Sequence, residues 1–261
     1  MTFSERYGPW AIIVGASEGI GAAWAHALAR RGLNVVLVAR REQALKEVAE
    51  AIKKAHGVQV ATVVADAASP DLMTAIEAVD HDIGLYVHNA AYSPGGDFLK
   101  RQVADQLKAV DVNVRAPVLL SHFFGQKFVA RGRGGIVLMS SLTALQGTPN
   151  IATYGATKSF NLALGEALHS ELKPLGVDVL VCCAGATLTR PYLEVTRPAV
   201  SPGELEPEAV VEAALRQLGK RAYMIPGAFN RFAAFAMSRL LSRATAIKIL
   251  ASQTKKLKVL P

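Results

Sequence analysis

Short apolar runs alternate with amphipathic segments along most of the chain, and this alternation limits the possible folds more than any other feature. The amphipathic segments have helical spacing and end at glycine, as in GAAWAHALARRG and EQALKEVAEAIKKAHG. The apolar runs are β-branched and lack a polar face, which is typical of parallel strands covered on both sides. They are AIIVGA, NVVLVAR, VQVATVVAD, IGLYVHNAA, GGIVLMSS and VDVLVCCAG. The pattern predicts an α/β fold with a doubly wound parallel sheet and helices on both faces.

Length and apolar content predict one domain over residues 1–261, because a chain of 261 residues that is 51% hydrophobic can bury one large core. No uncharged apolar run approaches the roughly 20 residues of a membrane-spanning helix, and the N-terminus has no apolar signal region. The only cysteines, Cys182 and Cys183, are adjacent within an apolar run, which favours buried reduced thiols. We therefore expect a cytoplasmic protein. The histidines form no HExxH or comparable pair, so we expect no metal site.

The positive charge is concentrated near the C-terminus. The formal net charge is +8, yet residues 213–261 contain ten Lys or Arg and no acid, so residues 1–212 have a slight negative excess. A nucleic-acid-binding protein usually spreads basic residues over one face with exposed aromatics between them. The main body has no such pattern, and we expect no nucleic-acid partner.

The first predicted strand runs into GASEGIG, residues 15–21. Glycines at positions 15, 19 and 21 leave the backbone bare where it turns from strand to helix. Amide N–H groups and the helix dipole can then face a pyrophosphate. The same spacing also suits a tight turn, but its place after the first strand of an alternating chain favours phosphate binding.

The second predicted strand ends at Arg40 and Arg41, where an NAD-specific fold usually has an acid for the ribose 2′-hydroxyl. Two guanidinium groups suit a 2′-phosphate instead, so NADP is favoured over NAD. The alternative is that both arginines solvate the start of the next helix. Asp66 is expected to close the third strand and accept a hydrogen bond from the adenine amine, or to cap the SPDLM turn that follows.

The segment TYGATKSF places Tyr154 and Lys158 four residues apart. On a helix these side chains share a face, and the small residues between them let a flat cofactor approach. A neighbouring ammonium favours the phenolate, so we expect Lys158 to lower the pKa of Tyr154 from about 10 toward neutrality. Tyr154 would then be a general acid for a carbonyl oxygen. Ser141 ends a predicted strand and would hold the same oxygen.

These motifs, in this order, resemble the short-chain dehydrogenase/reductase family over about residues 8–190. The resemblance implies a single Rossmann-like domain and an NADP-dependent oxidoreductase that transfers a hydride between NADP(H) and a small-molecule carbonyl or alcohol. It also implies a homo-oligomer, either a dimer or a tetramer. By resemblance, Asn113 holds a water that links the lysine to solvent, and it completes a catalytic set with Ser141, Tyr154 and Lys158. Lys158 would also bind the nicotinamide ribose.

The residues expected to contact the cofactor combine the positions argued above with those that the resemblance adds. They are Gly15, Ser17, Gly19, Ile20, Gly21, Arg40, Arg41, Asp66, Asn89, Tyr154, Lys158, Gly185 and Thr187.

Three departures from the family pattern stand out, and none of them removes a catalytic group. The NNAG segment reads His88-Asn89-Ala90-Ala91, and the PGxxxT segment reads AGATLT over residues 184–189. Glu18 stands in the glycine turn, where it would repel a phosphate unless it points to solvent. The missing proline would loosen the loop over the nicotinamide.

Residues 188–206 have the family's location for a loop that covers the substrate. Apolar side chains there predict a substrate of some hydrophobic bulk, but steroid, ketoacyl, aromatic ketone and sugar substrates are not separated. These side chains are Leu188, Tyr192, Leu193 and Val195.

Residues 229–261 form a basic segment, and one amphipathic helix is expected from Phe229 to Ala251. We expect this segment to pack against the domain or a second subunit near the substrate entrance. The alternative is a membrane-surface lipid or ketoacyl reductase, whose acid-free tail docks on an anionic bilayer or carrier protein. A non-catalytic NADP-binding regulator is a third reading, against which the intact Ser141, Tyr154 and Lys158 argue. The expected apolar face consists of Phe229, Ala233, Ala236, Leu240, Ala244, Ile247 and Ala251.

Overall fold

The computed structural model describes residues 1–196 and 202–254. Seven parallel strands form one sheet in the order β3-β2-β1-β4-β5-β6-β7. All six predicted strands are present, and a two-residue strand at the edge was not predicted. The strands are β1 (Trp10–Val14), β2 (Asn34–Ala39), β3 (Val60–Val64), β4 (Ile83–His88), β5 (Gly134–Ser141), β6 (Val177–Ala184) and β7 (Tyr223–Met224).

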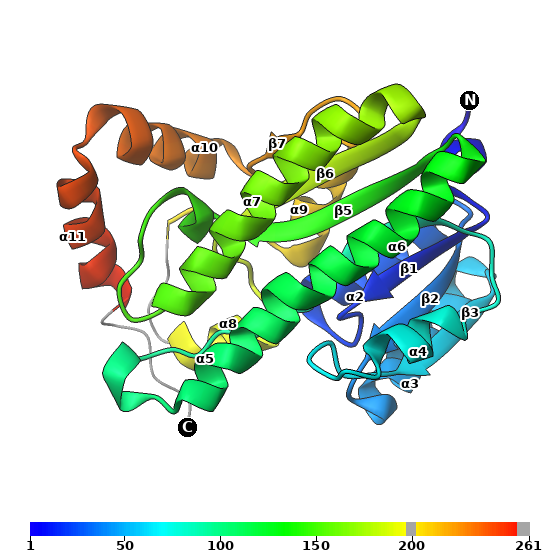
Figure 1. Ribbon diagram of the computed structural model, residues 1–261, viewed down its shortest axis with the longest axis horizontal. Helices are drawn as coiled ribbons and strands as arrows, with labels where there is room; N and C mark the ends of the chain where they lie inside the picture. The colour runs from blue at the N-terminus through cyan, green and yellow to red at the C-terminus, as the bar shows by residue number, and fades with distance from the viewer. Residues whose placement is uncertain (197–201, 255–261) are drawn as a thin grey trace.

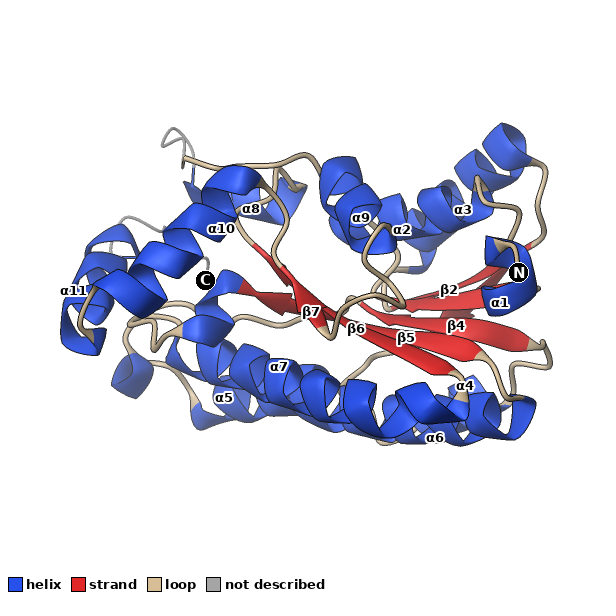
Figure 2. Ribbon diagram, turned by 90° about the horizontal axis from the view of Figure 1, so that it is seen from above, coloured by secondary structure: helices blue, strands red, loops and turns tan. Residues whose placement is uncertain are grey.

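Helices cover both faces of the sheet, as Figure 2 shows, so the doubly wound α/β prediction is confirmed. One face carries α2 (Gly19–Ala29), α3 (Glu42–His56) and α9 (Pro207–Leu215). The other carries α4 (Leu72–Glu77), α5 (Val103–Val110), α6 (Ala116–Arg131) and α7 (Ala152–Leu172). The remaining helices are α1 (Phe3–Tyr7), α8 (Arg190–Thr196), α10 (Ala228–Phe235) and α11 (Arg243–Thr254). Among the helices of residues 1–196 and 202–254, none combines the length and the apolar composition of a membrane-spanning segment.

The core consists of two apolar layers, one on each side of the sheet. Trp24 and Leu28 of α2 are fully buried in one layer, and Phe124 and Phe128 of α6 are buried in the other. Both cysteines are buried and unpaired, and burial raises the pKa of each thiol. The prediction of buried structural thiols is therefore confirmed.

The sheet order reverses between β1 and β4, because β2 and β3 extend to one side and β5 to β7 extend to the other. In an open parallel sheet, ligands bind at the carboxyl ends of the strands that flank this switch point. The functional side chains should therefore lie at the ends of β1, β4 and β5.

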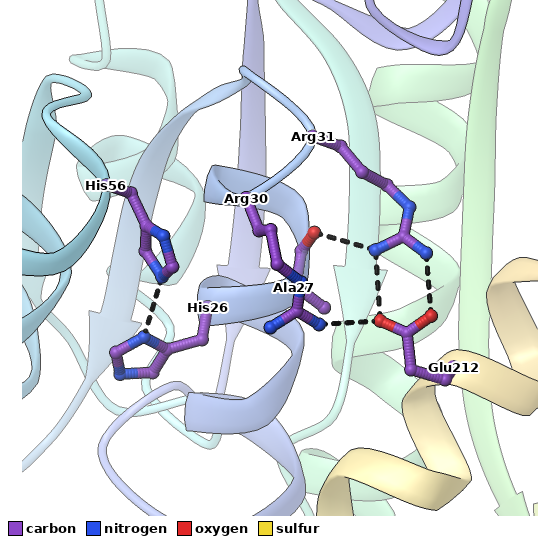
Figure 3. A network of polar contacts seen from close by, with 6 residues as sticks. All are labelled: His26, Ala27, Arg30, Arg31, His56 and Glu212. Atoms are coloured by element: carbon purple, nitrogen blue, oxygen red, sulfur yellow. Dashed lines mark hydrogen bonds and ion pairs between the residues drawn. The ribbon is translucent and has the colours of Figure 1, made fainter.

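An ionic cluster fixes α9 against α2 (Figure 3). Glu212 of α9 lies 2.7 Å from a guanidinium nitrogen of Arg30 and 2.7 Å from one of Arg31, and Arg31 also donates to the carbonyl of Ala27. A hydrogen bond from Arg31 is the largest cause that lowers the pKa of Glu212 to about 2. Between α2 and α3, Nδ1 of His26 lies 3.1 Å from Nε2 of His56.

The C-terminal segment does not form the single helix expected from Phe229 to Ala251, and that prediction is wrong. Helix α10 continues into a π-helical turn, Ala236–Leu240, after which Leu241 is extended with φ −108° and ψ 149°. Ser242 caps the next helix, since its hydroxyl accepts from the backbone N–H of Thr245 at 3.2 Å. Because of the break at Leu241, the residues before and after it do not lie on one continuous helical face.

The expected apolar face of this segment is also not the buried one. Between Phe229 and Ala251, the buried residues are Asn230, Ala234 and Ala246, whereas Phe229 is 52% exposed. Residues 255–261, which carry three of the ten basic residues, lie outside the described residues.

Candidate active site

The glycine turn lies directly after β1 and leads into α2. Gly15 and Gly19 have φ values of 89° and 54°, a left-handed conformation that favours glycine. A Cβ on Gly21 would lie 1.9 Å from the carbonyl oxygen of Gly15, so the turn requires a bare backbone. No side chain caps the first turn of α2. Its backbone N–H groups can therefore bind an anion, and this arrangement fits the pyrophosphate of a dinucleotide.

Asn89 follows β4 and holds the glycine turn. Its Nδ2 donates to the carbonyl of Gly15 at 2.8 Å, and the N–H groups of Asn89 and Ala90 donate to the carbonyl of Val14 at 2.9 and 2.7 Å. These bonds join the ends of β1 and β4 at the switch point. Ile20 is partly buried and packs against the core layer that contains Trp24 and Leu28.

The two arginines after β2 pair with acidic residues that follow β1 and β3. Arg41 lies 2.6 Å from the carboxylate of Glu18 and donates to the hydroxyl of Ser17 at 3.1 Å. Arg40 lies 3.6 Å from Asp66, and more than half of each arginine side chain is exposed. The guanidinium of Arg41 therefore offsets the negative charge of Glu18, which reduces the repulsion expected between Glu18 and a phosphate in the turn.

Asp66 lies two residues beyond the end of β3 rather than closing that strand. Its Oδ1 accepts from the N–H of Ala68 at 2.9 Å. The carboxylate thus caps the turn that follows, which is one of the two roles expected for it.

Tyr154 and Lys158 lie on the first turns of α7, near Ser141 at the end of β5. The Lys158 ammonium is 5.6 Å from the centroid of the Tyr154 ring and donates to the carbonyl of Met139 at 2.8 Å. Lys158 is 2% exposed, and burial lowers its pKa to about 8. The structure therefore brings these predicted residues together at the carboxyl edge of the sheet.

The expected shift in the pKa of Tyr154 is wrong in sign. Burial raises the pKa of this phenol above its ordinary value, and the Ser141 hydroxyl opposes the rise by hydrogen bonding. The nearby ammonium does not reverse the effect, because it is directed at the carbonyl of Met139. Tyr154 keeps its proton at neutral pH, as a proton donor must.

Asn113 is fully buried in a π-helical segment, Asp111–Arg115, between α5 and α6. Its Nδ2 donates to the carbonyl of Tyr92 at 2.8 Å and to the hydroxyl of Thr157 at 3.0 Å. Its Oδ1 accepts from the N–H of Tyr92 at 2.9 Å. Thr157 donates in turn to the carbonyl of Tyr154. Asn113 therefore joins the loop after β4 to the helix that carries the tyrosine.

Sequence reasoning missed the buried pair Tyr86 and His88 of β4. The Tyr86 hydroxyl lies 2.8 Å from Nδ1 of His88, and Nε2 of His88 lies 3.2 Å from the carbonyl oxygen of Val112, next to Asn113. Burial, followed by the charge of Lys158, lowers the pKa of His88 to about 3, so the ring is neutral. The signal was the histidine in place of the first family asparagine.

The segment after β6 closes against the glycine turn. The hydroxyl of Thr187 donates to the carbonyl of Gly185 at 3.1 Å, and a Cβ on Gly19 would lie 2.8 Å from Cγ2 of Thr189. The expected loop over residues 188–206 contains α8, and Leu188, Tyr192 and Leu193 are half-buried. Residues 197–201 and the side chain of Val195 lie outside the described residues.

Across residues 1–196 and 202–254, no group of three or more His, Cys, Asp or Glu could hold a metal ion.

Residues 9–197 match the family model described as short chain dehydrogenase, and the chain therefore belongs to this family. It is an oxidoreductase that acts on CH–OH and C=O groups. A 7beta-hydroxysteroid dehydrogenase of Mediterraneibacter gnavus is 35% identical over 239 residues, which cover 88% of this chain and 90% of the relative.

Solved structures share the fold, and two of them are similar to this chain over most of its length. One comes from work on 7beta-hydroxysteroid dehydrogenase stereoselectivity; it is 30% identical, with a TM-score of 0.90 and coverage of 96% of this chain and 99% of the other. The other is a short-chain dehydrogenase from Sphingobium yanoikuyae in complex with NADPH. It is 30% identical, with a TM-score of 0.78 and coverage of 89% and 94%.

Proposed function

We propose that this protein is an NADP(H)-dependent dehydrogenase or reductase of a hydroxysteroid or a similarly bulky, apolar alcohol or ketone. The observation that carries the proposal is that Tyr154, Ser141 and Lys158 lie together at the edge where the glycine turn opens. The relatives that are 7beta-hydroxysteroid dehydrogenases support the substrate class.

In the direction of reduction, Tyr154 donates its phenolic proton to the substrate oxygen. Ser141 hydrogen-bonds the same oxygen and holds it near the phenol. Lys158 supplies a buried positive charge 5.6 Å from the ring centroid, and this charge favours the phenolate that remains after proton transfer. The nicotinamide of the bound cofactor supplies the hydride in reduction and accepts it in oxidation.

The remaining site residues bind and position. Gly15, Gly19 and Gly21, with the N-terminus of α2, would hold the pyrophosphate, and Asn89 would line the adenosine side while fixing the turn. Asn113 acts through Thr157 on the start of α7. We also include in this proposal the role that the family resemblance gives to Asn113, which is to hold a water that links Lys158 to solvent.

NADP preference rests on Arg40 and Arg41 at the end of β2. A 2′-phosphate placed between them would be held by charge-assisted hydrogen bonds. Arg41 already pairs with Glu18 at 2.6 Å, whereas Arg40 lies 3.6 Å from its acidic partner. Arg40 is therefore the arginine that we assign to the phosphate.

A panel of carbonyl and alcohol substrates tests the proposed class directly. The panel pairs 7-hydroxysteroids and 7-ketosteroids with short ketoacyl thioesters and sugars, each with NADP(H) and NAD(H), and absorbance of the reduced nicotinamide reports turnover. We expect the highest kcat/KM for a steroid with NADP(H). Faster turnover of sugars or ketoacyl thioesters contradicts the substrate class, and NADPH binding without any turnover indicates a regulator instead.

We also propose that the protein is a homo-oligomer. Large apolar side chains along α5 and the turn before it are exposed, among them Leu99 at 89% and Val103 at 71%. Light scattering coupled to size-exclusion chromatography tests this, since a monomeric mass contradicts it.

A further inference from the structure

The C-terminal segment reaches both loops that border the catalytic residues. Figure 1 shows α10 and α11 beside the loop that joins β5 to α7. Within that loop, Gln146 donates to the carbonyl of Arg243 at 2.9 Å and Asn150 donates to the hydroxyl of Thr254 at 3.2 Å. The second border is the loop after β6, and α10 contacts it through one buried side chain.

The loop after β6 has a base made of two limbs, residues 185–189 and 203–205. The limbs pair like short parallel strands at Thr187 and Leu205. The N–H of Leu188 donates to the carbonyl of Leu205 at 2.9 Å, and the N–H of Leu205 donates to the carbonyl of Ala186 at 3.1 Å. The first limb contacts the glycine turn through Thr189, whose Cγ2 would lie 2.8 Å from a Cβ on Gly19.

Asn230 of α10 is 4% exposed and lies against this base. Its Nδ2 donates to the carbonyl of Gly203 in the second limb at 3.0 Å, and to the carbonyl of Pro226 at 3.1 Å. An amide nitrogen has two N–H groups, so both of its donors are used. The bonds tie the second limb to the chain that leads into α10.

Both limbs have glycine where they meet this amide. A Cβ on Gly185 would lie 2.8 Å from Nδ2 of Asn230, and a Cβ on Gly203 would lie 2.5 Å from its Oδ1. Gly203 also has a φ of 83°, which side chains with a Cβ rarely adopt. The amide therefore fills a space between the limbs that only glycines leave open.

We infer that Asn230 is a positioning residue that fixes the base of this loop and thereby sets how well a bulky substrate binds. The part concerning substrate binding rests on the proposed function. The part concerning loop position does not, because it follows from the two hydrogen bonds and the two glycines alone.

Asn230→Asp tests the inference, since it keeps the shape of the side chain and places a carboxylate against two carbonyl oxygens. We expect hydrogen exchange at the amides of Leu188 and Leu205 to accelerate at least about tenfold, while amides of β1 and β4 keep their protection. We expect KM for the best steroid to rise about tenfold, with kcat and NADPH affinity within about threefold of wild type. If this variant does not fold, Asn230→Ser, which keeps one donor, replaces it with the same expectations.

Asn34→Asp is the matched control, because Asn34 accepts from the N–H of Gln59 at the opposite edge of the sheet and a carboxylate can still accept there. It should leave exchange and KM unchanged. Wild-type exchange at Leu188 and Leu205 in a folded Asn230 variant overturns the inference, as does faster exchange with unchanged KM. The same effects in the control also overturn it. If no steroid is turned over by the wild type, the proposed function fails, and the exchange measurement still decides whether Asn230 positions the loop.

Discussion

Burial controls the protonation of three side chains around the site. It raises the pKa of Tyr154, lowers that of Lys158 to about 8, and is the largest cause that lowers that of His88 to about 3. At pH 7 the site therefore has a neutral phenol, a mostly charged ammonium and a neutral imidazole. This combination suits proton donation to a ketone oxygen, because the Tyr154 phenol carries its proton and the Lys158 ammonium lies near the ring.

The pH dependence of reduction should follow from these shifts. Lys158 loses its charge as the pH rises through about 8, and the phenolate is then no longer favoured. We expect kcat/KM for ketone reduction to fall above that pH, with an apparent pKa near 8. Initial rates between pH 6 and 10, corrected for stability, measure this. A flat profile up to pH 10 contradicts the role of the ammonium.

Arg40→Ala should weaken NADPH binding by about 1.5–3 kcal/mol, the scale of a hydrogen bond to a charged group. NADH lacks the 2′-phosphate, so its affinity should change much less. Fluorescence titration of the reduced cofactors measures both, with Arg216→Ala on the far end of α9 as the control. Equal losses for the two cofactors, or a wild-type preference for NADH, would show that Arg40 does not recognise the phosphate.

At the scale of elements, Glu212 shows how one residue holds a helix in place. Its folded pKa of about 2 lies below the ordinary 4.5, so the unfolded chain binds more protons between these values. The stabilisation is full above about pH 4.5 and is lost as the pH falls toward 2. We expect Glu212→Gln to lower the free energy of unfolding by about 1 kcal/mol at pH 7, because the cluster is partly exposed.

Urea denaturation at pH 7 and pH 2.5 tests this, since the difference between variant and wild type should shrink at the lower pH. Glu50→Gln is the control, because Glu50 pairs with Lys53 on an exposed surface of α3. An equal effect in the control, or a difference that does not depend on pH, contradicts the account.

The sequence predicted the first six strands, the glycine turn and the Tyr154 and Lys158 pair, because each depends on residues close together in the chain. The π-helical segment at Asn113 and the break at Leu241 were not predicted, since helical periodicity does not show an inserted residue. Pairings between distant segments, such as Arg41 with Glu18 or Asn230 with Gly203, depend on the assembled fold. The direction of the pKa shift of Tyr154 depends on burial of the phenol, and a sequence motif does not show burial.

At the scale of the whole molecule, the C-terminal segment has two possible roles, which are packing against the domain and docking on a membrane or carrier protein. Hydrogen bonds to two loops favour a packed structural role for this segment. Gln146 and Asn150 bond to α11, and Asn230 bonds to the loop after β6. We expect deletion of residues 229–261 to give an aggregated or inactive protein, because both loops lose buried partners.

Purification, activity and flotation with anionic liposomes distinguish the readings of this truncation. A soluble, active truncation that has lost salt-sensitive liposome binding would support a membrane-docking tail instead. A soluble, active truncation with unchanged membrane, carrier and subunit association would contradict both readings.

In the proposed hydride-transfer reaction, Tyr154 donates the proton to the substrate oxygen. Tyr154→Phe removes the hydroxyl and leaves the ring, the glycine turn and Arg40 in place. Single-turnover reduction of the best ketone with NADPH, together with NADPH affinity, tests this most directly. We predict that the rate falls at least about a hundredfold while the affinity for NADPH stays within about threefold of wild type. Near-normal turnover in the Tyr154→Phe protein would contradict the account.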